Sequence, residues 1–80
     1  MLQQSEVREA ALLMIRRRGT NAAVRATYRA LGLQQEGDLE AAAIWQRVSN
    51  EITRIRAEER ETYAATLALY DSKAGERLTG

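Results

Sequence analysis

The chain has 80 residues, a net charge of +1, and no Pro, Cys, His or Phe. A chain of this length forms a single domain and buries only about 60% of the surface that its unfolded form exposes. Without Cys there is no disulfide, thiolate nucleophile or thiolate-bound metal, and without His the commonest general base and neutral metal ligand are missing. Carboxylate-only metal sites and Asp/Glu acid–base pairs remain open on composition. Because the sequence shows no nucleophile–base pair and no cofactor fingerprint, we expect a non-enzymatic protein with no cofactor, no metal and no small-molecule substrate.

The hydropathy pattern predicts a cytoplasmic protein with no membrane association. No basic segment leads into an apolar stretch near the start, and the longest apolar run covers residues 10–15, far short of the roughly 20 residues of a membrane span. The charge is uneven, because residues 1–33 carry six Arg against two Glu (+4) and residues 34–80 carry six basic against nine acidic side chains (−3). The N-terminal part is therefore the basic half of the chain.

The abundance of Ala, Leu, Arg, Glu and Gln, with no Pro, predicts an all-α fold. The first helix is expected over residues 5–18, with Ser5 as its N-cap. Its apolar stripe at helical spacing consists of Val7, Ala11, Met14 and Ile15. We expect Gly19 to end this helix in a left-handed conformation.

The second helix is expected over residues 21–31, with Gly32 as its end. Val24, Tyr28 and Leu31 fall at i, i+4 and i+7 and form its apolar stripe. Because the connection over residues 19–21 is short, the first two helices should form an αα-hairpin or a helix-turn-helix corner.

The third helix is expected over residues 38–73, with Asp38 as its N-cap and residues 74–80 as a frayed tail in which Gly75 is a plausible stop. Its apolar stripe is the strongest in the chain and consists of Ala41, Trp45, Val48, Ile52 and Ile55. The position of Trp45 within this stripe predicts core packing rather than an exposed binding anchor.

A second stripe, formed by Tyr63, Leu67 and Tyr70, follows the charged residues 56–62. A continuous helix over residues 38–73 would be roughly 54 Å long, whereas a compact domain of this size has a radius of gyration of about 12 Å. Either the helix breaks near residues 56–60 and a fourth helix folds back, or it projects and needs a partner. The absence of Gly and Pro in this interval favours the projecting helix, and hence three helices with a long third one.

These patterns lead to two hypotheses of function. Because Tyr is enriched in interfaces, Tyr63, Leu67 and Tyr70 predict a small interaction or regulatory protein that forms a homodimer or binds another protein. The alternative is a nucleic-acid-binding regulator that uses a helix-turn-helix-like arginine patch. The arginine patch consists of Arg16, Arg17, Arg18, Arg25 and Arg29. Three consecutive arginines point in different directions, and Thr27 is the one side chain there suited to reading base edges, so the patch is the second choice.

Residues 11–55 also carry a pattern of spaced glycines, alanines and apolar residues. It comprises Ala-Leu-Leu-Met-Ile with a Gly four residues after the Ile, Ala23, Ala26 and Arg29-Ala30, then Gly37-Asp38 and Ala43-Ile44-Trp45 with Arg47-Val48. In these residues the chain resembles small uncharacterised all-helical proteins of alphaproteobacteria. The resemblance implies a three-helix core and assigns no activity, cofactor or site residue.

Overall fold

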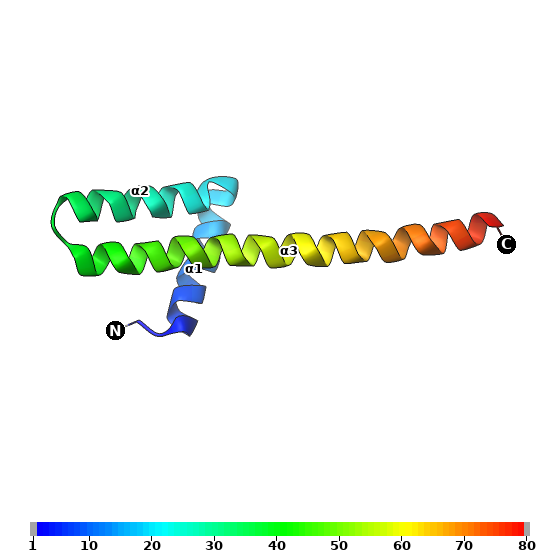
Figure 1. The fold of residues 1–80 in the computed structure, drawn as a ribbon, viewed down its shortest axis with the longest axis horizontal. Helices are drawn as coiled ribbons and strands as arrows, with labels where there is room; N and C mark the ends of the chain where they lie inside the picture. The colour runs from blue at the N-terminus through cyan, green and yellow to red at the C-terminus, as the bar shows by residue number, and fades with distance from the viewer. Residues whose placement is uncertain (1, 80) are drawn as a thin grey trace.

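The protein is all-helical, as predicted. The computed structural model describes residues 2–79 and the side chains of residues 2–71, and this part contains no strand. Helix α1 spans Gln4–Arg18, a single 3₁₀ turn η1 spans Gly19–Asn21, α2 spans Ala22–Gln35, and α3 spans Leu39–Thr79. Helix α2 runs back alongside the first part of α3, α1 crosses this pair steeply, and the rest of α3 projects alone (Figure 1). The molecule is accordingly elongated, with extents of 65 × 22 × 16 Å.

Helix α1 begins before the predicted cap. Its N-cap is Gln3, which makes no side-chain capping bond, so the prediction of Ser5 as the cap is wrong. The first turn is instead held by tertiary contacts, because Gln4 donates to the carboxylate of Glu51 on α3 at 2.7 Å. At the other end Gly19 follows the helix as predicted and has a positive φ of 56°, but its ψ of −129° is not that of the left-handed helical conformation. Its carbonyl accepts a 2.8 Å hydrogen bond from Arg56 of α3.

Helix α2 continues past Gly32, so the prediction that this residue ends the helix is wrong. The stop lies at Gly37, whose φ of 88° reverses the chain. The Gly37 amide donates to the carbonyl of Gln34 at 3.1 Å, and the Asp38 amide donates to that of Leu33 at 2.9 Å. This pair of bonds is a Schellman motif, which satisfies the last carbonyls of the helix. Glycine permits a helix end, but these bonds decide where it occurs.

The face of α2 that packs against the core is not its stripe of large apolar residues. The buried residues are Ala22, Ala26, Ala30 and Leu33. Val24, Tyr28 and Leu31 are exposed instead. Both sets recur at helical spacing, but alanine lets the backbones of α2 and α3 approach closely along their whole shared length. The large apolar side chains of α2 are thereby left on the outside.

The core lies where α1, α2 and α3 meet. Its buried residues are Val7, Ala11, Ala22, Ala26, Val48, Ile52 and Ile55. The predicted stripe of α1 faces this core, with Met14 and Ile15 partly buried against it. The predicted stripe of α3 does so as well, except for Ala41, which is only half-buried and lies outside this cluster. Trp45 is also partly buried against the core, as expected for a packing residue.

Helix α3 is continuous across residues 56–60, and no fourth helix folds back on the described residues. Asp38 caps it as predicted, since its Oδ1 accepts a 3.2 Å hydrogen bond from the Ala41 amide. The helix runs on to Thr79, so it passes the predicted end near Lys73 and is not stopped by Gly75. In the described part of the chain no helix is both long enough and apolar enough to cross a membrane.

Candidate functional site

The part of α3 beyond the core carries the predicted interface residues. We call residues 58–71 the arm, and every one of them is exposed. Tyr63 and Tyr70 are 67% and 71% exposed, and Leu67 is 44% exposed. The sequence analysis missed Leu69, which is 67% exposed. The arm therefore presents four large apolar side chains that the rest of the described chain leaves uncovered.

The stripe of the arm continues the core-facing side of α3. Trp45 and Tyr63, like Ile52 and Tyr70, are 18 residues apart, which is about five turns of a straight helix. Helices α1 and α2 cover this side of α3 through Ile55 and leave it open afterwards. The same helix face is thus core at one end of α3 and surface at the other.

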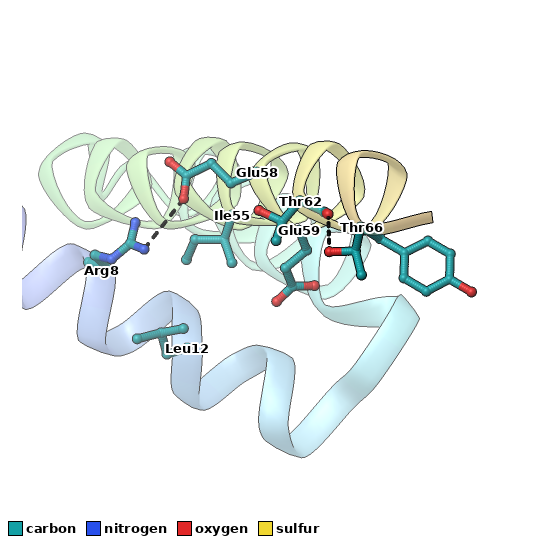
Figure 2. A pocket seen from close by; sticks show the side chains of 8 residues that line it. Arg8, Leu12, Ile55, Glu58, Glu59, Thr62 and Thr66 are labelled. Carbon is teal, nitrogen blue, oxygen red and sulfur yellow. Dashed lines mark hydrogen bonds and ion pairs between the residues drawn. The ribbon is translucent and has the colours of Figure 1, made fainter. Parts of the chain in front are cut away.

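A groove of about 520 Å³ joins the core to the arm. Leu12 of α1 forms one wall, and Ile55, Thr62 and Thr66 of α3 form the other, with open space between the two helices (Figure 2). Tyr63 also lines it, so the groove and the stripe of the arm meet. The hydroxyl of Thr66 donates to the Thr62 carbonyl at 2.9 Å and needs no outside partner. An apolar side chain could therefore enter without leaving that hydroxyl unpaired.

A network of charged side chains fixes the two walls of this groove. Glu51 is buried, and its carboxylate receives Arg8 of α1 at 3.0 Å in addition to Gln4. Arg54 lies 3.7 Å from the same carboxylate, and the second amino group of Arg8 lies 3.5 Å from Glu58. The sequence analysis did not single out Glu51, because a glutamate on a helix usually faces water. Here it anchors α1 on α3.

The acidic residues at the base of the arm do not assemble a metal site. In the part of the chain that the structure describes, no group of three or more potential metal ligands lies close enough together to hold an ion. Glu58 and Glu59 instead pair with arginines, at 3.5 Å and 3.6 Å. Their role in the structure is electrostatic pairing at the rim of the groove.

The arginine patch is spread over two helices. Arg16, Arg17 and Arg18 occupy the last turn of α1, and Arg25 and Arg29 lie on α2. All five are exposed, and none forms an ion pair with another described residue. Thr27, the candidate base-reading residue, is instead bonded to Ser49 of α3 at 2.8 Å. The patch offers positive charge for phosphates, but Thr27 is already engaged within the chain.

Comparison with models of known protein families, with curated proteins and with solved structures finds no match for this chain.

Proposed function

We propose that this protein is a small non-enzymatic interaction and regulatory protein, a three-helix domain that binds through its arm and associates with a second copy of itself. The observation that carries the proposal is the exposure of Tyr63, Leu67 and Tyr70 on a helix that extends beyond the core. Uncovered apolar groups of this size are typical of binding surfaces. The groove beside Leu12 extends the same surface toward the core.

The size of the surface supports association through the arm and groove together. An aromatic side chain buries roughly 150–250 Å², so the four arm tyrosines of a dimer, Tyr63 and Tyr70 of each copy, offer roughly 500 Å² at about 70% exposure. At about 25 cal/mol per Å² this is roughly 12 kcal/mol. Association costs about 4–15 kcal/mol, so burial of the arm tyrosines exceeds this cost unless it lies near the upper end of the range. Leu67 and the groove add to the affinity.

The experiment places a charge on this surface in the full chain. Tyr63→Glu and Leu67→Glu should each abolish association through the arm, while circular dichroism shows an unchanged helical fold. Ala65→Glu is the matched control, because it adds the same charge to an exposed position of the arm outside the stripe. If Tyr63→Glu and Leu67→Glu associate like the parent protein, the arm is not the interface.

The alternative, a nucleic-acid-binding regulator, is supported by the five exposed arginines of the patch, which have no acidic partner among the described residues. The two functions separate cleanly. Binding of a duplex would depend on the arginine patch and on salt, whereas self-association would depend on the stripe of the arm.

A further inference from the structure

The line of contact between α2 and α3, which we call the seam, is covered by α1 on one side and open on the other. Buried side chains of α1 belong to one core cluster with Ala22 and Ala26 of α2 and with Ile52 of α3. In the view of Figure 1, α1 passes behind α3, so the near face of the α2–α3 pair has no helix over it. This open face is far from the arm along α3, and the function proposed above does not use it.

Two grooves follow the open side of the seam, with volumes of about 380 and 260 Å³. Val24, Tyr28 and Leu31 line them from α2. Val24 is 53% and Tyr28 68% exposed, and Leu31 is also exposed. We call these three residues with the two grooves the seam face. A cavity of about 150 Å³ holds a benzene ring, so each groove has room for a tyrosine side chain from outside.

The floor of the larger groove is already satisfied in its hydrogen bonding. The hydroxyls of Thr27 and Ser49 are 2.8 Å apart, and that of Ser49 also donates to the Ala23 carbonyl at 3.3 Å. The Thr53 hydroxyl donates to the Ser49 carbonyl at 3.2 Å. A partner that covers these groups leaves none of them without a hydrogen bond, so removing water from the floor of the groove costs little free energy.

No charged side chain lines either groove, whose polar lining consists of hydroxyls and the amides of Gln34 and Gln46. Two copies of a charged surface repel each other across a two-fold axis, but two copies of this surface do not. Arg25 and Arg29 of α2 lie outside both grooves, although each follows a residue of the seam face in the sequence. The lack of charge inside the grooves therefore favours a second copy of this chain over a partner recognised through acidic or basic groups.

The spacing of the seam face also suits a two-fold pairing. Val24 lies four residues before Tyr28, and Leu31 lies three residues after it. When α2 of a second copy packs antiparallel on this α2, with the centre of the contact near Tyr28, Leu31 of each copy lies opposite Val24 of the other. We propose that the seam face binds the same face of a second copy, with the two α2 helices antiparallel and Tyr28 of each copy inserted into a groove of the other.

The size of the face sets the strength of this contact. Helix α2 is about 21 Å long, and two helices packed side by side are about 20 Å wide. Two copies that meet over this area bury roughly 840 Å² in total, below the roughly 1,200–2,000 Å² of stable complexes and in the range of weak, transient ones. The association should therefore be reversible and visible as a rise in mass with concentration.

The test measures solution mass by light scattering for a set of full-length variants. In the background of Tyr63→Glu, which disables the arm, the protein should still form a dimer of twice 9.0 kDa at high concentration. Adding Tyr28→Glu should reduce this mass to 9.0 kDa, whereas adding Gln35→Glu, an exposed change in α2 outside both grooves, should not. If the Tyr63→Glu protein is already a monomer, the proposal is wrong. It is also wrong if a dimer persists after Tyr28→Glu is added. Loss of the arm interface is read separately, from Tyr63→Glu compared with the parent.

Cross-linking tests the antiparallel arrangement, and the absence of native Cys makes it clean. A mixture of the Val24→Cys and Leu31→Cys proteins should form a disulfide-linked dimer of one chain of each kind under mild oxidation. Either protein alone should not, because its two cysteines would lie about 10 Å apart along the helices, beyond the about 7 Å limit for Cα atoms in a disulfide. Equal cross-linking of each protein alone, or none in the mixture, overturns the antiparallel pairing.

Discussion

Leu67→Ala tests the arm with a change whose size follows from the structure. Full burial of a leucine side chain stabilises by about 1.5–3 kcal/mol. Leu67 is 44% exposed, so a partner can bury slightly under half of it, worth about 1 kcal/mol. A symmetric dimer contains two such leucines, and removing both costs about 2 kcal/mol. Since about 1.4 kcal/mol is a factor of ten in affinity, the dimer should dissociate about 30-fold more readily.

The assay is sedimentation equilibrium over a range of concentrations, compared with urea unfolding of the same variant when dilute. The unfolding free energy of the monomer should change by less than about 0.5 kcal/mol, because every arm residue is exposed and alanine favours a helix as well as leucine does. An unchanged dissociation constant refutes the placement of Leu67 in an interface. A fall in monomer stability of several kcal/mol refutes the claim that the arm is uncovered.

Three further predictions concern residues outside the arm stripe and the alternative function. Gly32→Ala should stabilise the protein by about 0.5–1 kcal/mol, because Gly32 lies inside α2 with nothing within 4 Å of an added Cβ. Gly37→Ala should destabilise it by more than about 1 kcal/mol, because the φ of Gly37 is positive. Equal effects of the two variants in urea unfolding would contradict an end of α2 at Gly37. Glu51→Ala should cost about 1–3 kcal/mol, because it removes the charge-assisted hydrogen bonds that Gln4 and Arg8 of α1 donate to α3. Glu58→Ala, at an exposed ion pair, should cost less than about 1 kcal/mol. A thermal melt that ranks the two variants oppositely removes Glu51 as an anchor. The protein should not be retained on duplex DNA or RNA at about 50 mM salt, and retention that declines steeply as salt rises would instead favour the arginine patch.

Helix α2 shows where sequence reasoning succeeds and where it stops. Its existence and its amphipathic spacing follow from composition and periodicity. Which stripe is buried does not, because the alanines and the larger apolar residues both recur at helical spacing. The choice depends on how closely α3 can approach, and that is a property of the assembled pair. The prediction therefore placed Val24, Tyr28 and Leu31 on the apolar stripe without showing that they remain outside.

The candidate site divides in the same way. The stripe of Tyr63, Leu67 and Tyr70 and the projecting helix could be predicted, because nothing in residues 56–62 interrupts a helix. The groove beside the arm could not, since it arises where α1 crosses α3 and brings Leu12 near Ile55. Burial of Glu51 was equally inaccessible, because its partners Gln4 and Arg8 are more than forty residues away in the sequence.

The measurement that tests the account most directly is the solution mass of the unmodified protein, by light scattering on size exclusion, from micromolar to millimolar concentration. Association through exposed apolar surfaces predicts a mass that rises above 9.0 kDa as the concentration increases. A constant mass of 9.0 kDa over the whole range would contradict self-association through either the arm or the seam face.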